Sequence, residues 1–199
     1  TDYSTAFSSK GTSTVAGIGV MGGGLNQITH SSNFHVDSAG NIYVADFSNN
    51  RVMKWAPGAS EGTVIAGENG QGSATNQLYF PFGVYVDSSK NIYVADTSNN
   101  RIMKWEPGAT SGTVVAGGNG AGSANNQFND PIDVHVDSSG NIYVADRYNY
   151  RVMKWEPGAT SGTVVVGGNG QGSENNQLSN SNSIYVDSSG TIYVADSGN

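Results

Sequence analysis

The three histidines are the side chains in this chain best suited to chemistry. His35 and His135 stand at the same point of an internal repeat, where Tyr85 and Tyr185 also stand, and His30 lies five residues before His35. Three imidazoles can hold a zinc ion that activates water. A metal-dependent lyase or hydrolase is therefore one hypothesis. Side chains at such a repeated position more often pack on a neighbour, so we predict no metal and no cofactor here.

A second set of polar and aromatic side chains lies where the third repeat departs from the others. It reads Arg-Tyr-Asn-Tyr at 147–150, where the first two repeats read Phe-Ser-Asn-Asn at 47–50 and Thr-Ser-Asn-Asn at 97–100. A site that reads one ligand has to be asymmetric, and these residue types suit a polar ligand or a partner protein. The predicted binding patch is Asp130, Asp133, Arg147, Tyr148 and Tyr150. The equivalent places on other repeats hold His30, Phe47, Phe80 and Phe82. Neutral drift on exposed loops is the alternative.

The repeat that carries these residues is 50 residues long. Ile-Tyr-Val-Ala-Asp stands at 42–46, 92–96, 142–146 and 192–196. The third repeat contains four short apolar or alternating runs, separated by turns rich in Gly, Ser and Asn, which predict four strands. These runs are 131–137, 141–146, 151–155 and 163–166. A long polar connection leads to the next repeat, so the chain is predicted to be all-β.

A four-stranded meander cannot bury both of its faces alone, but sheets stacked around an axis bury them against each other. We therefore predict one β-propeller domain over 1–199, with four-stranded blades at about 1–50, 51–100, 101–150 and 151–199. The first strand of each blade would line a central channel, with His35, Tyr85, His135 and Tyr185 as channel candidates. In a ring of four blades the two histidines would face each other across the axis. A β-solenoid is the alternative, although its repeats are usually shorter.

The sequence starts and stops at matching points of the repeat. The last blade would therefore be completed by strands from residues 1–17, of the same chain or of a neighbouring one. Residues 12–17 match a fourth strand well, whereas residues 1–5 match a third strand poorly. Strand exchange between chains would be head-to-tail and would give a ring or a filament. A structural, self-assembling subunit is thus an alternative function.

The repeat resembles the NHL repeat. The resemblance rests on Pro-x-x-Val-x-Val-Asp-x-x-Gly-Asn-Ile-Tyr-Val-Ala-Asp at 131–146, followed by Asn149 and Arg151. The second repeat fits as well, although Lys90 replaces the turn glycine, and Pro is absent at Ser31 and Ser181. The resemblance implies a β-propeller, usually of six blades, whereas four repeats are visible here. NHL proteins include protein- or RNA-binding modules and a few enzymes, such as the amidating lyase of peptide hormones.

Residues that recur in every repeat are predicted to be structural. An Asp can cap loop N–H groups and an Arg can bind carbonyls or a nearby carboxylate. This role is expected for Asp46, Asp96 and Asp146 with Arg51, Arg101 and Arg151. Asp37, Asp87, Asp137 and Asp187 should close the first hairpin of each blade. Trp55, Trp105 and Trp155 are predicted to pack in the core rather than to form a carbohydrate platform.

Composition and charge narrow the function classes. The net charge is −7, so an acidic surface would repel nucleic acid, and no run is apolar enough for membrane insertion. Cysteine is absent, which removes disulfides and thiolate sites. We expect an extracellular or secreted protein. The predicted function is non-catalytic recognition or scaffolding through the loops, with a protein or a small polar ligand as partner, because near-identical blades lack the unlike, converging groups that catalysis needs.

Overall fold

The computed structural model describes residues 14–17 and 19–198, and its strands form four antiparallel sheets. Blade 1 consists of β1 (Ser31–Val36), β2 (Ile42–Asp46), β3 (Arg51–Trp55) and β4 (Thr63–Ala66). Blade 2 consists of β5 (Pro81–Val86), β6 (Ile92–Asp96), β7 (Arg101–Trp105) and β8 (Thr113–Gly117). Blade 3 consists of β9 (Pro131–Val136), β10 (Ile142–Asp146), β11 (Arg151–Trp155) and β12 (Thr163–Gly167). Blade 4 has β13 (Ser181–Val186) and β14 (Ile192–Asp196).

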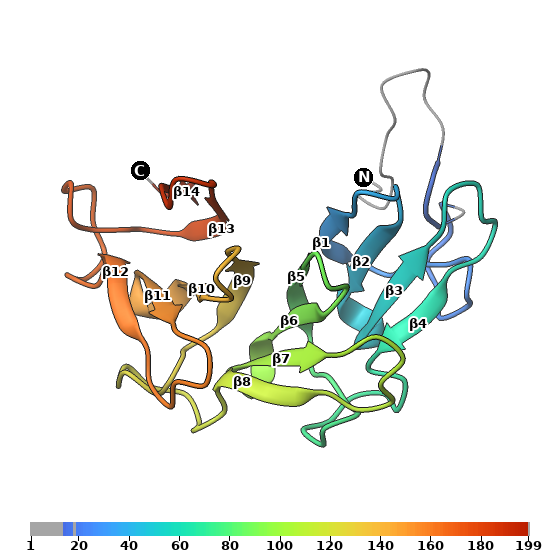
Figure 1. Cartoon of the computed structure of the whole chain (residues 1–199), viewed down its shortest axis with the longest axis horizontal. Helices are drawn as coiled ribbons and strands as arrows, with labels where there is room; N and C mark the ends of the chain where they lie inside the picture. Colours follow the sequence, from blue (N-terminus) through green and yellow to red (C-terminus); the bar gives the residue numbers. More distant parts are fainter. Residues whose placement is uncertain (1–13, 18, 199) are drawn as a thin grey trace.

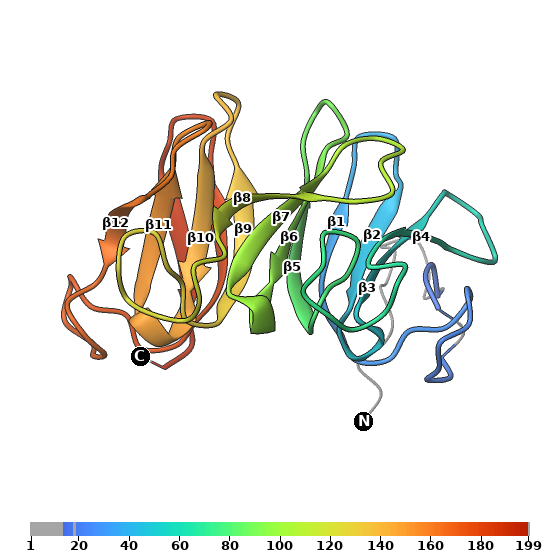
Figure 2. The same ribbon diagram turned by 90° about the horizontal axis from the view of Figure 1, so that it is seen from below.

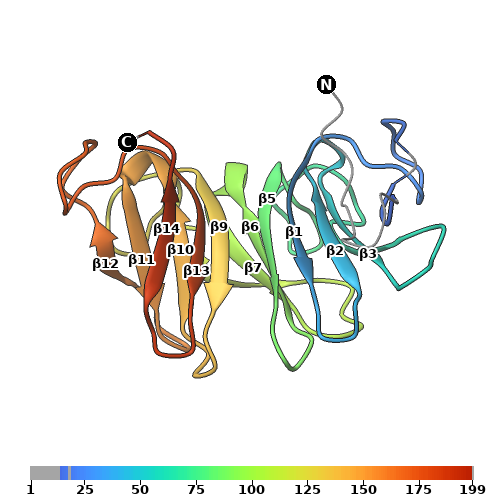
Figure 3. The same ribbon diagram turned by 90° about the horizontal axis from the view of Figure 1, so that it is seen from above.

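The sheets are arranged as propeller blades, so the predicted fold is confirmed. The innermost strands β1, β5, β9 and β13 follow one another along an open arc, and β4, β8 and β12 lie at the rim (Figure 1). Each second strand is joined to the third by a short 3-10 turn. These turns are η1 (Phe47–Asn49), η2 (Thr97–Asn99) and η3 (Arg147–Asn149). Seen from the side, the blades stand next to each other with their strands roughly upright (Figures 2 and 3).

Side chains on the two faces of each second strand pack against different neighbours. Tyr43 and Ala45 pack towards blade 2, whereas Val44 and Ile42 pack on the opposite face of blade 1. Opposite faces take alternate residues because successive side chains of a strand point to opposite sides of the sheet. The tryptophans of the third strands are buried, as predicted: Trp105 and Trp155 lie in these junctions, and Trp55 packs with Ala16 and Ile28 on the outer face of blade 1.

Blade 4 remains two-stranded within the described part of the chain. Ala16, which the repeat places in register with Ala66 of β4, is buried against Ile28, Val44 and Trp55 on the face of blade 1 that points away from blade 2. Residues 14–17 therefore lie beside blade 1, while β13 and β14 lie at the other end of the arc (Figure 1). The predicted strand at 1–5 falls outside the described residues, as does the beginning of the one at 12–17.

The open arc changes the expected place of the histidines. Tyr85 lies between His35 and His135, with its ring centroid 5.0 Å from that of His35 and 4.7 Å from that of His135. The two imidazoles therefore belong to one continuous row of rings and do not face each other across a closed ring of four blades. No helix in the described part of the chain is long and apolar enough to cross a lipid bilayer.

Candidate functional site: the loop face and the channel groove

A buried Asp–Arg pair anchors the loop after each second strand. In blade 3, Asp146 ends β10 and Arg151 begins β11 directly opposite it, so Arg151 Nε donates to Asp146 Oδ2 at 2.7 Å. The other carboxylate oxygen accepts from the backbone N–H of Asn129 at 2.7 Å. The guanidinium also donates to the carbonyls of Ser123, Ala124 and Gln127. Equivalent bonds are made by Asp46 with Arg51 and by Asp96 with Arg101, so the predicted structural role is confirmed.

Backbone bonds join this loop to the segment that enters the blade. The N–H of Tyr148 donates to the carbonyl of Asn129 at 3.1 Å, and that of Arg147 donates to Asp130 at 3.3 Å. Ser98 and Tyr79 make the matching bond in blade 2 at 3.1 Å. The two loops thus share one surface of the propeller, as predicted. We call this surface the loop face; it consists of residues 29–30, 47–50, 79–80, 97–100, 129–130, 147–150 and 179–180.

Three of the predicted patch residues meet on the loop face of blade 3. The carboxylate of Asp130 lies 2.5 Å from Arg147 Nη2. The same guanidinium lies 4.8 Å from the centroid of the Tyr148 ring, and Nη2 also donates to the Tyr148 hydroxyl at 3.2 Å. Tyr148 is 54% exposed. We call Asp130, Arg147 and Tyr148 the blade 3 patch: a held cation with an accessible aromatic ring beside it.

Tyr150 was predicted to belong to this patch, but much of its ring is covered. It adopts a left-handed backbone conformation with φ 51°, in the place that Asn50 and Asn100 hold in the other blades. Asn is favoured there because its short polar side chain tolerates positive φ. The Tyr150 ring packs against the apolar cluster between blades 3 and 4, so it supports the loop from below.

Asp133 lies away from the patch, at the innermost strand. Its carboxylate is buried and accepts four hydrogen bonds, two from the N–H groups of Val134 and Ile184 and two from side chains. Those side chains are Asn33 of blade 1, at 3.0 Å, and Ser183 of blade 4, at 2.7 Å. Burial raises the pKa of Asp133, while these hydrogen bonds lower it. Asp133 thus links three blades in the structure.

An aromatic cluster lies on the loop face between blades 1 and 2. The rings of Phe47 and Phe80 are stacked with centroids 4.7 Å apart, and Phe82 meets Phe47 edge-on at 6.1 Å. Tyr79 adds a fourth ring, 4.8 Å from Phe80. The sequence showed that Phe47 replaces the Thr97 of the next repeat, but Tyr79 was missed. Its signal was the aromatic pair Tyr-Phe at 79–80, where the third repeat has Asn-Asp at 129–130.

The four channel candidates come together as a row of alternating rings. His135 and Tyr185 complete the row, with centroids 5.3 Å apart in an edge-on arrangement. These rings, with Asp137 and Asp187, line a pocket of about 550 Å³ that we call the channel groove. Burial lowers the pKa of both His35 and His135, so neutral imidazoles face the groove at neutral pH.

His30 lies apart from the other two histidines. Its Nδ1 is 3.0 Å from the hydroxyl of Ser48 on the loop face, and the side chain is exposed. Among the described residues, no group of three or more His, Cys, Asp or Glu side chains is arranged to hold a metal ion. The three-imidazole arrangement considered from the sequence is therefore not formed.

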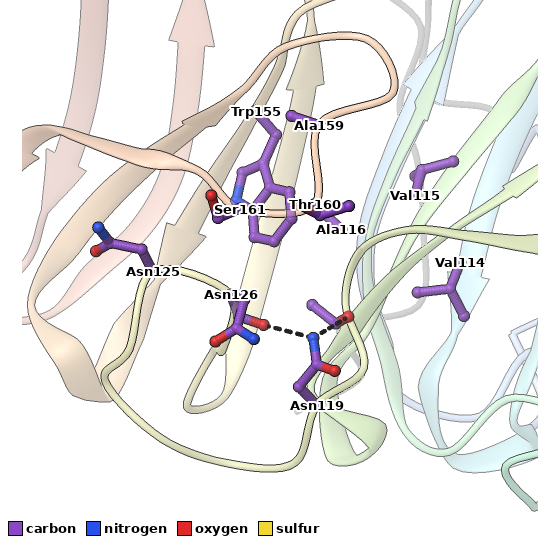
Figure 4. Close-up of a pocket in the computed structure, with 11 residues that line it drawn as sticks. Val114, Val115, Ala116, Asn119, Asn125, Asn126, Trp155, Ala159, Thr160 and Ser161 are labelled. Carbon is purple, nitrogen blue, oxygen red and sulfur yellow. Dashed lines mark hydrogen bonds between the residues drawn. The ribbon is translucent and has the colours of Figure 1, made fainter.

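Further pockets lie at the rim, where one blade meets the next. The pocket in Figure 4, of about 560 Å³, lies between β8 and the loop after Trp155, and Asn119, Asn125 and Asn126 line it. Blades 1 and 2 form a smaller counterpart of about 260 Å³ beside Trp105. The rim pocket thus recurs at the junction between blades. Because Trp155 is only 2% exposed, its indole offers no open face for stacking a sugar.

Comparison with known proteins agrees with this architecture. The family model described as NHL repeat matches residues 78–105 and 128–155. These segments run from the end of the entering connection to the tryptophan of the third strand in blades 2 and 3. The chain therefore carries NHL repeats and resembles the NHL-repeat β-propellers, as its sequence predicts. No curated protein sequence matches the chain.

Several solved structures share the fold at low sequence identity. A protein of unknown function from Bacteroides thetaiotaomicron is 20% identical with a TM-score of 0.65, over 82% of this chain and 44% of that one. A chain of a nidogen/laminin complex is 18% identical with a TM-score of 0.64, over 84% and 57%. An auxiliary nutrient binding protein from B. thetaiotaomicron is 14% identical with a TM-score of 0.58, over 80% and 43%. The chain thus spans about half the length of these proteins.

Proposed function

We propose that the chain is a non-catalytic binding module that recognises a partner protein through its loop face. The observation that carries the proposal is the blade 3 patch, where a guanidinium is held between a carboxylate and an exposed tyrosine. Arg and Tyr are among the residues that contribute most to protein interfaces when they sit on a rigid support. Asp146, the residue before Arg147, is held in the buried pair with Arg151, which fixes the start of this loop.

The rest of the loop face suits the same kind of partner. The aromatic cluster of Tyr79, Phe80, Phe47 and Phe82 lies on blades 1 and 2, and the charged patch lies on blade 3. Apolar anchors beside a polar, charged region are typical of protein-recognition surfaces. Solved structures of similar fold include an auxiliary nutrient binding protein and a chain of a nidogen/laminin complex, which supports a binding role without naming a partner.

The test uses a variant that removes the patch side chains but keeps the buried Asp146–Arg151 pair. Wild-type protein and the double variant Arg147→Ala, Tyr148→Ala would be immobilised, and proteins captured from the source organism would be identified by mass spectrometry. Each candidate would then be purified and its affinity measured directly. The matched control is Ser98→Ala, which alters the position in blade 2 that corresponds to Tyr148. A specific partner should lose at least tenfold in affinity for the double variant and keep it for the control; equal affinity for all three proteins would contradict the proposal.

A small polar ligand in the channel groove is the second candidate. It is favoured by a pocket of about 550 Å³ that combines four aromatic rings with the carboxylates of Asp137 and Asp187. Aromatic faces with a few polar groups suit a hydroxyl-rich molecule. Saturation-transfer NMR with a panel of mono- and disaccharides would test this, with Tyr85→Ala as the variant and Arg147→Ala as the control. The absence of a transfer signal for every saccharide would count against it. The extracellular location expected from the composition remains a prediction.

A further inference from the structure

The junction between blades 2 and 3 contains a rim pocket that the proposed function does not use. Its volume is about 560 Å³, within the range of about 300–1,000 Å³ typical of small-molecule sites. The pocket lies between β8, the outermost strand of blade 2, and the loop that follows Trp155 in blade 3 (Figure 4). Blades 1 and 4 pack against the outer sides of this pair of blades, so the pocket belongs to an internal junction.

One side of this pocket is apolar and the other carries uncharged polar groups. The apolar wall consists of Val114, Val115 and Ala116 of β8, and Val114 is 45% exposed. The polar groups are amides of the connection to blade 3 and hydroxyls of the loop after Trp155: Asn119, Asn125, Asn126, Thr160 and Ser161. Within the described part of the chain, the side-chain amides of Asn125 and Asn126 make no hydrogen bond. Their donors and acceptors are therefore open to a ligand.

Charge distinguishes this pocket from its counterpart one junction earlier. Among the described residues, no ionisable side chain lines the larger pocket, although the chain has a net charge of −7. The counterpart between blades 1 and 2 is smaller, about 260 Å³, and is lined by Glu68 and Glu106. Gly118 stands in blade 2 at the repeat position of Glu68, and Asn125 stands at that of Thr75. The larger pocket thus suits an uncharged ligand, because an ion would find no partner there.

The indole of Trp155 adds an unpaired N–H to the pocket. Its Nε1 is buried and has no hydrogen-bond partner among the described residues, and Figure 4 shows it on the side of the ring next to Ser161. An added methyl group at Gly162 would lie nearest Nε1 and Cδ1, whereas at Gly112 it would lie nearest ring carbons of Trp105. The two indoles are therefore turned differently. An unpaired buried N–H is unfavourable, and a ligand oxygen bound beside Ser161 would satisfy it.

These features fit a sugar better than a peptide strand. A peptide that adds to a sheet needs an uninterrupted strand edge. The pairing of β8 with β7 shifts register between Ile102 and Met103 and leaves Val115 without a partner residue; such a bulge disfavours pairing at an edge. A neutral sugar needs no edge, and it combines an apolar C–H face with hydroxyls that both donate and accept.

We propose that the rim pocket between blades 2 and 3 binds a neutral sugar. The C–H face of the sugar packs on Val114 and Val115, and its hydroxyls bond to the amides of Asn125 and Asn126. An amide both donates and accepts, so each can bind two neighbouring hydroxyls. A further oxygen accepts from the indole N–H beside Ser161. The site is separate from the loop face and from the channel groove, so it adds a ligand to the proposed function and does not depend on it.

Isothermal titration calorimetry with defined sugars tests the proposal. The probes are glucose, galactose, mannose and N-acetylglucosamine and the linear oligosaccharides of each, up to millimolar concentration, and at least one should bind. The double variant Asn125→Ala, Asn126→Ala should bind that probe at least about tenfold more weakly, because it removes the amide hydrogen bonds. The matched control is Thr75→Ala, Asn76→Ala, which alters the same repeat positions one junction earlier. This control should keep the affinity of the wild type.

Both double variants should fold, because the backbone bonds at these positions remain. Gly162 donates to the carbonyl of Asn125 and Gly112 to that of Thr75, and circular dichroism checks the fold. The absence of binding for every sugar overturns the proposal. Equal affinity of the Asn125→Ala, Asn126→Ala variant and the wild type also overturns it, since the sugar would then bind elsewhere, such as in the channel groove. Binding of an uncharged Ser-Val peptide but of no sugar would show strand addition in its place.

Discussion

Blade 3 contains two Asp–Arg pairs, and their surroundings are opposite. The side chains of Asp146 and Arg151 are 0% and 6% exposed, and both make further bonds to the backbone of the entering segment. The side chains of Asp130 and Arg147 are 22% and 25% exposed and lie beside the open ring of Tyr148. The first pair recurs in blades 1 and 2, whereas the second occurs in blade 3 alone among the described pairs.

The difference distinguishes residues that stabilise the propeller fold from residues that form its accessible surface. A buried pair whose partner is removed leaves an uncompensated charge, so the protein depends on both members. A partly exposed pair contributes less to folding because water screens it, and its residues are therefore freer to change between blades. The comparison leads to four predictions, ordered from the largest effect on stability to the smallest.

Removing the buried cation should give the largest effect. Arg151→Ala leaves Asp146 buried without its partner and frees three backbone carbonyls. We expect a loss of about 3–5 kcal/mol in the free energy of unfolding, measured by urea titration with tryptophan fluorescence. A loss below about 1 kcal/mol, of the size typical of exposed pairs, would remove the distinction between the two pairs.

The carboxylate that links three blades should come next. Asp133→Ala removes the acceptor of the buried N–H of Ile184 and of the partly buried side-chain bonds from Asn33 and Ser183. Unsatisfied buried donors cost roughly 1–3 kcal/mol each, partly relieved by water, so we expect a total loss of about 2–3 kcal/mol. Asn33→Ala, which removes one donor and keeps the acceptor, is the control and should cost clearly less. Equal losses would show that the carboxylate is not the centre of the network.

Acid should weaken the hairpin turns. Burial opposes ionisation of Asp137, but bonds from the side chain and backbone of Asn141 and from the N–H of Ser139 hold its pKa below the usual value. A carboxyl with a lowered folded-state pKa contributes stability above its unfolded pKa, near 4, and loses it as pH falls through the folded pKa. Urea titrations at about pH 7 and about pH 3 should therefore show a smaller pH-dependent loss of stability for Asp137→Asn than for the wild type, and solvent screening of this accessible carboxylate keeps the difference small. Identical pH dependence of the two proteins would contradict this role.

Removing the exposed cation should change stability least. Arg147→Ala gives up an ion pair that water partly reaches, so we expect a change of about 1 kcal/mol or less. Measured beside Arg151→Ala, it is the direct comparison of the two pairs in one blade. A loss above about 2 kcal/mol in the free energy of unfolding would show that Arg147 stabilises the fold, as Arg151 does.

The sequence predicted the parts of the fold that depend on local pattern. The 50-residue repeat, the alternation in Ile-Tyr-Val-Ala-Asp and the Gly- and Asn-rich turns gave the strands and the blades, because these signals act over a few residues. Lys90, in place of a turn glycine, takes φ 67° and its ammonium lies 3.0 Å from Asp37 of blade 1. Lys90 thus forms the same turn that glycine forms in the neighbouring repeats.

The sequence could not predict contacts that join distant repeats. Asp133 and Asn33 are far apart in the chain, and nothing in either repeat shows that they meet. Tyr150 was grouped with Arg147 and Tyr148 because all three depart from the repeat in one loop, but its ring packs against the apolar cluster between blades 3 and 4. The sequence also left open whether four blades close into a ring, since the repeat fixes the shape of a blade and not the angle between blades.

The hydrogen bond from Asn33 to Asp133 limits which gains or losses of repeats the fold can tolerate. It passes blade 2 at Gly83, where an added methyl group would lie 2.7 Å from the Cα of Asp133. Arrays of near-identical repeats gain and lose units when their copies recombine unequally, and residues 104–115 and 154–165 are identical. A gain or loss between the first and third repeats would separate the two ends of the bridge. Selection for a stable fold should therefore preserve the number of repeats in this stretch even while their surface loops diverge.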